Sequence, residues 1–182
     1  MESNSRKTQI LKEIFGYDSF RKGQEEIVDQ ILNGKDVLAI MPTGAGKSLC
    51  YQVPALLMSG ITIVVSPLIS LMIDQVKALN EAGVHAAYIN SALTERQITK
   101  ALELAAAGRY KMIYVAPERL LTPRFLDFAC HTELSMVTID EAHCISQWGQ
   151  DFRPSYVKIA EFIRNLQDAR SSVHLQQQQH RK

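Results

Sequence analysis

A glycine-rich segment between a short apolar run and a predicted helix constrains this chain more than any other feature. The segment reads MPTGAGKS over residues 41–48, after the β-prone run Val37–Ile40 and at the start of a helix predicted from Lys47 to Met58. Glycines let backbone N–H groups turn toward an anion, and a helix N-terminus adds its positive end. Strand, loop and helix together predict a phosphate-binding loop rather than a surface turn, although Met41 stands where the general pattern has Gly.

The side chains of this loop indicate the ligand it binds. Lys47 is expected to reach the β- and γ-phosphates of a nucleotide, and the Ser48 hydroxyl is expected to ligate Mg²⁺. The residues expected to contact the nucleotide are Thr43, Gly44, Ala45, Gly46, Lys47 and Ser48. The loop therefore predicts a site for a nucleoside triphosphate together with Mg²⁺.

An acidic pair provides the second half that such a site requires. Asp140 and Glu141 directly follow the buried-strand candidate Met136–Ile139. Asp140 is expected to hold Mg²⁺ through water, and Glu141 to orient and polarise the attacking water. Both motifs would lie at the carboxyl ends of parallel strands, where such sheets bind ligands. We therefore predict nucleotide hydrolysis, with Lys47, Asp140 and Glu141 as catalytic residues.

Short apolar runs alternate with longer amphipathic ones along most of the chain. The strand candidates are Val37–Ile40, Ile61–Val65, His85–Ile89, Met112–Val115 and Met136–Ile139. Helices are predicted at Lys47–Met58, at Leu68–Ala82 and from Thr94 to Ala107, the last with Thr94 as N-cap and Gly108 as C-cap. This alternation predicts an α/β fold of three layers around a mainly parallel central sheet.

Composition limits the classes of protein that remain. A length of 182 residues, with 46% hydrophobic and 21% charged residues, fits one folded domain. A formal net charge of +1 excludes a strongly basic nucleic-acid-binding arm. Three scattered cysteines without a C-x-x-C pair argue against a disulfide framework and a zinc site. No apolar stretch approaches the ~18 residues that span a bilayer, so we expect a cytoplasmic protein that does not enter membranes.

Further segments resemble the motifs of one helicase family. Besides GAGKS and DEAH, they are FGYDSFRKGQ (15–24), SPLISLM (66–72), YVAPER (114–119) and DEAHCISQWGQDFRPSY (140–156). The combination, over about residues 10–163, resembles the RecQ-type DNA helicases of superfamily 2, whose form of the loop accounts for Met41. The resemblance implies a RecA-like domain that uses ATP and Mg²⁺. It also implies 3′-to-5′ unwinding, with single-stranded and forked DNA as partners, in repair, recombination and replication at the bacterial nucleoid.

The resemblance assigns adenine recognition to the segment before the loop. Tyr17, Arg21 and Gln24 match the adenine-reading positions, where they offer an aromatic face, a guanidinium and an amide. Without the resemblance, Tyr17 and Phe20 would be the apolar face of a short helix.

The resemblance also implies contacts with DNA. Ser66 and Ser70 are implied to bind phosphates of single-stranded DNA, although they equally suit a strand-to-helix turn with serine capping. An aromatic-rich loop offers stacking surfaces for unpaired bases, or alternatively a hydrophobic plug. Its implied DNA contacts are Gln147, Trp148, Phe152 and Arg153. Gln150 replaces the histidine usual in this family, and glutamine cannot become cationic, so the coupling of DNA to ATP departs from the family here.

The C-terminal segment departs from the alternating pattern. From Gln167 onward the chain is polar and low in complexity, and it is predicted to form neither helix nor strand. We therefore predict a flexible N-terminus at 1–9, an ATP-binding RecA-like domain at 10–166 that is truncated at its C-terminal end, and a polar tail at 167–182. The family's second RecA-like domain, which supplies an arginine finger, is absent from this sequence.

The genetic code suggests one origin for this tail. Glutamine codons read one nucleotide earlier become alanine and threonine codons, and residues 169–182 can be regrouped as RPVVRALTATATPK. That string resembles the T-A-T segment of the family. A frameshifted coding sequence is therefore one hypothesis, and a native disordered tail is the other.

Two functions other than DNA unwinding stay open. The chain could be a non-catalytic module that binds nucleotide or single-stranded DNA, left by truncation. It could also belong to an RNA-remodelling relative in superfamily 2. The aromatic-rich loop and the 15–24 motif favour the DNA helicase, and the sequence indicates no particular protein partner.

Overall fold

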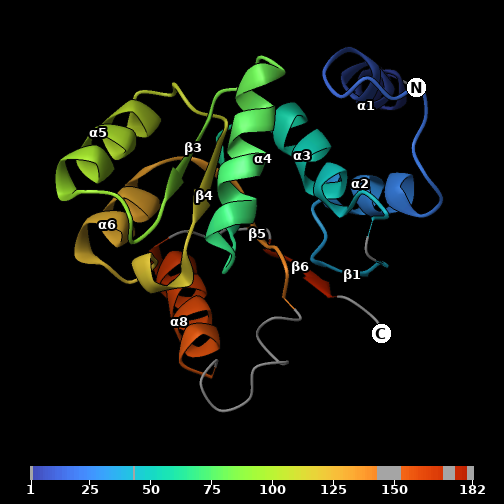
Figure 1. The fold of residues 1–182 in the computed structure, drawn as a ribbon. Coiled ribbons are helices and arrows are strands. Elements are labelled where there is room, and N and C mark those ends of the chain that lie inside the picture. Colours follow the sequence, from blue (N-terminus) through green and yellow to red (C-terminus); the bar gives the residue numbers. More distant parts are fainter. Residues whose placement is uncertain (1, 43, 143–152, 170–174, 180–182) are drawn as a thin grey trace.

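A parallel sheet forms the centre of the molecule in the computed structural model, which describes residues 2–42, 44–142, 153–169 and 175–179 (Figure 1). Its strands are β1 (Val37–Ile40), β2 (Ile61–Val65), β3 (Ala86–Ile89), β4 (Met112–Val115), β5 (Leu134–Ile139) and β6 (Leu175–Gln179). Their spatial order is β1-β6-β5-β2-β4-β3, and every neighbouring pair is parallel. The predicted α/β fold with a mainly parallel sheet is confirmed.

Helices cover both faces of the sheet and give the predicted three layers (Figure 1). The helices of one side are α1 (Glu2–Glu13), α2 (Gln24–Leu32), α3 (Lys47–Leu57) and α4 (Ile69–Glu81). Those of the other side are α5 (Glu95–Ala106), α6 (Pro123–His131) and α8 (Arg153–Ala169), with the short 3₁₀ turn η1 (Pro117–Arg119) after β4. The expectation of a flexible N-terminus was wrong for residues 2–9, because they belong to α1 and the buried Lys7 forms ion pairs with Glu25 and Asp29 on α2. No helix in the described part of the chain is long and apolar enough to cross a membrane.

The strand β2 shows why the central strands are so apolar. All five of its residues are buried. Ile61, Ile63 and Val65 pack into the core beneath α5, α6 and α8, whereas Val64 packs into the core beneath α2, α3 and α4. Since alternate side chains of a strand point to opposite faces, a strand covered on both sides needs apolar residues at nearly every position.

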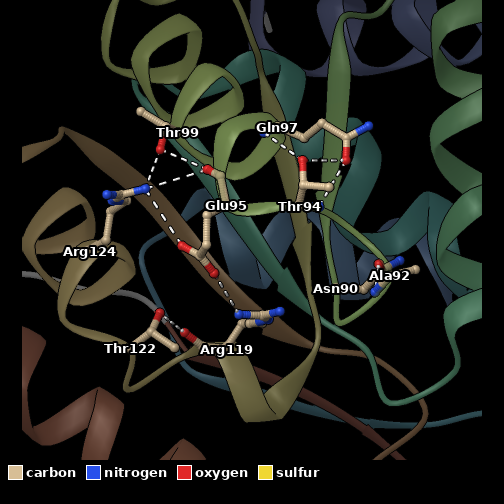
Figure 2. Close-up of polar contacts among 9 residues, drawn as sticks. All are labelled: Asn90, Ala92, Thr94, Glu95, Gln97, Thr99, Arg119, Thr122 and Arg124. Carbon is tan, nitrogen blue, oxygen red and sulfur yellow. Dashed lines mark hydrogen bonds and ion pairs between the residues drawn. The ribbon is translucent and has the colours of Figure 1, made fainter.

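The helix α5 begins where its sequence predicts and ends one residue earlier than predicted, so that Ala107 takes the C-cap position expected for Gly108. The Thr94 hydroxyl accepts a hydrogen bond from the Gln97 backbone N–H at 3.3 Å, and the Gln97 side-chain oxygen accepts one from the Thr94 N–H at 2.8 Å (Figure 2). This reciprocal pair is a capping box. Ala107 is the C-cap, and Gly108 follows it with a φ of +72°, the left-handed conformation that commonly ends a helix.

The segment after Gln167 is ordered differently from the prediction. The helix α8 continues to Ala169, and β6 pairs in parallel with both β1 and β5, with Gln176 opposite Val37 and Thr138. The expectation of neither helix nor strand in this segment was therefore wrong. A run of glutamines has no alternation of apolar and polar residues from which a strand could be predicted. Backbone hydrogen bonds to the strands on either side stabilise β6 whatever its side chains are.

The strand β1 has one open face. Val37 packs toward α2, α3 and α4, so its alternating neighbours Leu38 and Ile40 point to the opposite side. There Leu38 is 57% exposed and Ile40 is 53% exposed. The layer of α5, α6 and α8 therefore leaves this end of the sheet uncovered at β1.

Candidate active site

The carboxyl ends of four strands form one edge that carries the candidate site. Three backbone hydrogen bonds link the residue after one strand to the last residue of its neighbour: Asp140 N–H to Val65 O at 2.8 Å, Ser66 N–H to Val115 O at 3.1 Å, and Ala116 N–H to Ile89 O at 3.0 Å. The predicted magnesium ligand Asp140 and the predicted DNA contact Ser66 therefore lie at the same level on neighbouring strands.

Glycine is required at two positions of the phosphate loop. Gly44 and Gly46 have φ values of +78° and +75°, which side-chain-bearing residues rarely adopt, and Gly46 is the N-cap of α3. A Cβ atom at Gly46 would lie 2.7 Å from the side-chain nitrogen of Gln24. A substitution at Gly46 would therefore strain the backbone and displace the end of the Gln24 side chain from the loop.

The predicted adenine-reading residues lie against this loop. The buried Gln24 donates from Nε2 to the carbonyl oxygens of Ala45 and Gly46, both at 3.0 Å, and Arg21 donates from Nη1 to Gly44 O at 2.7 Å. Gln24 Oε1 accepts from the Arg21 N–H at 2.8 Å. These contacts brace the loop from outside.

Tyr17 borders an open space beside the loop. Its side chain is 47% exposed and lines a cavity of about 320 Å³ together with Gly46 and Ser48. An aromatic ring next to the loop and next to a cavity is a suitable neighbour for a planar base.

Asp140 is buried but well supported. Its side chain is 5% exposed, Oδ1 accepts from the Glu141 N–H at 2.9 Å, and Oδ2 accepts from the Tyr51 hydroxyl at 3.1 Å. Burial, with a contribution from the charge of Glu141, raises the pKa of Asp140, while the two hydrogen bonds and the positive charge of Lys47 partly oppose that rise. The positive charge of Lys47 therefore acts on Asp140, as is expected if the loop and the acid motif belong to one site.

Tyr51 belongs to a buried polar cluster that sequence reasoning missed. Tyr51 lies on α3, and its hydroxyl is 3.3 Å from that of Tyr114 on β4, which accepts from Gln52 Nε2 at 3.1 Å. Burial raises the pKa of both tyrosines well above the ordinary value, so both stay protonated. The signal in the sequence was the polar pair Tyr51-Gln52 inside an otherwise apolar helix, directly after the loop.

Glu141 has an unusual backbone conformation. Its φ is +53°, and it is the only non-glycine residue with a positive φ in the described ranges. Residues other than glycine, asparagine and aspartate seldom adopt this region, and strained positions of this kind cluster at functional sites. The strain is consistent with the predicted catalytic position of Glu141.

The donor set fits Mg²⁺. The Ser48 hydroxyl is on the first turn of α3, and the Asp140 carboxylate follows β5. Hydroxyl and carboxylate oxygens are the hard ligands that Mg²⁺ prefers, and it commonly takes only one or two protein groups beside phosphates and water. These two residues would therefore hold the ion beside the bound phosphates.

The same edge contains three unsatisfied donors farther along the sheet. Within the described residues, Ser66 Oγ, Asn90 Nδ2 and Arg119 Nε are buried and lack a hydrogen-bond partner. They follow the adjacent strands β2, β3 and β4, and sequence reasoning assigned a role only to Ser66. Ser70, the other predicted DNA contact, is exposed on the first turn of α4.

Glu95 forms ion pairs with two arginines near these unsatisfied donors. Glu95 lies 3.5 Å from Nη1 of Arg119 and 3.6 Å from Nη1 of Arg124 (Figure 2). It thereby links the start of α5 to η1 and α6. The Nε atom of Arg119 takes no part in this pairing.

Several predicted site residues lie outside the described residues. They are Thr43 of the phosphate loop, Gln147, Trp148 and Phe152 of the aromatic-rich loop, and Gln150. Arg153, the remaining predicted DNA contact, is the first residue of α8.

Comparison with known proteins identifies the family of the chain. The family model of the DEAD/DEAH box helicases matches residues 21–179, a range that includes β6. The ATP-dependent DNA helicase RecQ of Haemophilus influenzae is 48% identical over 160 residues, which cover 88% of this chain and 26% of the relative. The RecQ of Bacillus subtilis is 51% identical over 164 residues, which cover 90% of this chain and 28% of the relative. The chain thus spans about a quarter of the length of these relatives.

Solved helicase structures share the fold. The DUF1998 helicase MrfA bound to DNA and AMPPNP matches 96% of this chain with a TM-score of 0.79 at 17% identity, and 26% of MrfA is covered. A hypothetical ATP-dependent RNA helicase from Sulfolobus tokodaii matches 97% of this chain and 50% of its own length, with a TM-score of 0.66 at 18% identity. The expected RecA-like helicase fold is confirmed, and the chain belongs to the DEAD/DEAH box helicase family, with RecQ helicases among its relatives at about half identity.

Proposed function

We propose that this chain is the ATP-hydrolysing domain of a RecQ-type, ATP-dependent DNA helicase. One observation carries the proposal: the phosphate loop, the buried Asp140 and three unsatisfied donors occupy a single edge of the sheet. The relatives named ATP-dependent DNA helicase support the choice of ATP and DNA as ligands.

The proposed hydrolysis uses the groups of the loop and the acid motif. Backbone N–H groups of the loop and Lys47 bind the phosphates, while Ser48 and Asp140 hold Mg²⁺, which neutralises phosphate charge. Glu141 orients a water toward the γ-phosphorus and accepts its proton as the bond to ADP breaks. The braces from Arg21 and Gln24 keep the loop in place, and Tyr17 offers its ring to the adenine.

The proposed DNA contacts use the other part of the edge. Ser66, Asn90 and Arg119 follow the ends of three adjacent strands, and each has a donor without a protein partner. Phosphate oxygens of single-stranded DNA are acceptors of the required kind. Unwinding of a fork follows when the complete protein moves along one strand. We propose the cytoplasm, at the bacterial nucleoid, as the location of this activity.

The activity of the whole protein depends on more than this chain. An arginine from a second RecA-like domain typically contributes 10³–10⁵ in rate to phosphoryl transfer. Two domains must also close and open around ATP to move DNA. We therefore expect these 182 residues alone to bind ATP and single-stranded DNA weakly, with ATPase near background and no unwinding.

A chimera tests the proposal. This chain would replace the matching region of the Bacillus subtilis RecQ relative, and ATPase would be measured without nucleic acid, with single-stranded DNA and with RNA of the same sequence. We expect stimulation by DNA and displacement of one strand of a forked duplex, with Lys47→Ala as the inactive control. Binding without turnover in a folded chimera would instead indicate the non-catalytic module, and equal stimulation by RNA would indicate the RNA-remodelling relative.

A further inference from the structure

A chain of buried hydrogen bonds leads from α4 to the acid motif. Its links are Gln52 Nε2 to Gln75 Oε1 at 2.9 Å, Gln52 Nε2 to the Tyr114 hydroxyl at 3.1 Å, the Tyr114 hydroxyl to the Tyr51 hydroxyl at 3.3 Å, and the Tyr51 hydroxyl to Asp140 Oδ2 at 3.1 Å. Both tyrosines are fully buried, and Gln52 is 4% exposed. Bulk water therefore cannot substitute for the partners between Gln52 and Asp140, whereas Gln75 is only half-buried.

The chemistry of the groups fixes the direction of the chain. The amide nitrogen of Gln52 can only donate, so the Tyr114 oxygen accepts from it and the Tyr114 proton is free for Tyr51. An ionised carboxylate only accepts, so the Tyr51 proton points to Asp140. The three links from Gln52 to Asp140 thus all donate toward the carboxylate, and bonds aligned in this way strengthen one another. The second N–H of Gln52 donates in the other direction, to Gln75 on α4.

These bonds determine the orientation of the Asp140 carboxylate. Oδ1 takes the N–H of Glu141 and Oδ2 takes the hydroxyl of Tyr51, one protein donor for each oxygen. Two donors at fixed positions prevent rotation of the carboxyl group while leaving lone pairs on both oxygens for a cation. Tyr51 lies one helical turn after Lys47 on α3, so the helix that carries the phosphate loop also carries this donor.

We propose that Tyr51 is a positioning residue that orients the Asp140 carboxylate for Mg²⁺, with Tyr114 and Gln52 fixing the direction of its hydroxyl. The inference rests on the proposed function, because it concerns the same ATP site. It adds a residue outside the phosphate loop and the acid motif, and it gives α4 a hydrogen-bonded connection to the magnesium ligand.

The test measures the Mg²⁺ dependence of nucleotide binding by the chain. A fluorescent ATP analogue would be titrated with and without Mg²⁺, and the Mg²⁺ concentration for half-maximal enhancement would be recorded. Partners of metal ligands typically alter metal affinity 10–100-fold, so Tyr51→Phe is expected to raise this concentration about tenfold, with metal-free nucleotide binding unchanged. Tyr114→Phe removes the acceptor of Gln52 and releases the direction of the Tyr51 hydroxyl but keeps the bond from Tyr51 to Asp140, so it is expected to raise this concentration about threefold.

Tyr110→Phe is the matched control, because this half-buried tyrosine lies at the opposite end of β4 and its variant should leave the Mg²⁺ dependence unchanged. Thermal unfolding without metal or nucleotide would verify that each variant folds. An unshifted Tyr51→Phe, or a shift no larger than that of Tyr114→Phe, would overturn the inference. If Tyr51→Phe does not fold, the Tyr114→Phe variant becomes the test. An unchanged Mg²⁺ concentration for half-maximal enhancement in that variant would overturn the inference. Wild-type binding without any Mg²⁺ dependence would instead contradict the proposed ATP site.

Discussion

The two halves of the carboxyl edge of the sheet differ in whether their buried polar groups have hydrogen-bond partners. In the half formed by the phosphate loop, Asp140 and its neighbours, which we call the ATP half, buried polar side chains such as Gln24, Tyr51 and Gln52 all have protein partners. In the half formed by Ser66, Asn90 and Arg119, which we call the DNA half after the contact proposed for it, one donor of each residue has no protein partner.

The difference indicates how each half meets its ligand. Partners within the protein hold the ATP half in position before any nucleotide arrives, so ligand binding needs little rearrangement. A buried donor without a partner costs about 1–3 kcal/mol, and three such donors on adjacent strand ends suit an acceptor supplied from outside. If the two halves are independent, a substitution in one half should leave ligand binding by the other unchanged.

The largest effect is expected at Glu141. Glu141→Gln keeps the size of the side chain but removes its ability to accept a proton, and a general base typically contributes 10²–10⁴-fold to the rate. ATP hydrolysis by the chimera should fall by about that factor, while binding of ATP and of single-stranded DNA stays unchanged. Steady-state ATPase and equilibrium binding measure this, and wild-type turnover would move the catalytic role elsewhere.

The next effect separates ligand binding in the ATP half from that in the DNA half. Lys47→Ala should weaken Mg-ATP binding on the order of 100-fold, because it removes the charged donor to the phosphates. Single-stranded DNA binding should not change, and calorimetry would measure both affinities. Lys35→Ala, at an exposed lysine after α2, is the control. Parallel loss of both ligands would show that the halves are not separable.

A reciprocal effect is expected at Arg119. Arg119→Ala should weaken single-stranded DNA binding about tenfold. The slope of the logarithm of the binding constant against the logarithm of the salt concentration should fall by about one in magnitude, as for a lost phosphate contact. ATP binding should stay as in the wild type. Arg109→Ala removes an exposed arginine near the other end of β4 and serves as control. Equal losses for the two variants, measured by fluorescence anisotropy at several salt concentrations, would argue for nonspecific attraction.

The smallest effect concerns stability without ligands. Ser66→Ala removes an unsatisfied buried hydroxyl, so the free energy of unfolding should stay constant or rise by up to about 1 kcal/mol. Thr62→Val on β2 is the matched control, since the Thr62 hydroxyl is paired with that of Ser135 at 2.8 Å and its loss should cost about 1 kcal/mol. Urea denaturation measures both, and a loss of stability in Ser66→Ala would reveal an undetected partner.

The ATP half was largely predictable from the sequence because its local signals are strong. Glycine at positions 44 and 46 meets a backbone need that few residues satisfy, and β1, β2 and β4 have the predicted bounds because apolar runs mark buried strands. Thr94 caps α5 through contacts only three residues away. Each of these features depends on neighbours in the chain.

The features that escaped prediction depend on distant partners. Tyr51 and Tyr114 are 63 positions apart, and an apolar context predicts ordinary core packing for both. Asn90 and Arg119 can be recognised as part of a site only once the strand order β2-β4-β3 is known, because it brings the ends of their strands next to each other. The strand β6 is specified by β1 and β5 rather than by its glutamines. Sequence patterns report local preference, whereas these positions follow from the assembled sheet.

The open face of β1 has a consequence for how the protein behaves in concentrated solution. Leu38 and Ile40 present adjacent apolar side chains on a strand at the edge of the sheet, which favours contact between molecules. With a formal net charge of +1 and an isoelectric point near 7.7, molecules at neutral pH repel one another little. The apparent molecular mass from light scattering should therefore rise with concentration near that pH, and this rise should be smaller when the buffer is moved well away from it.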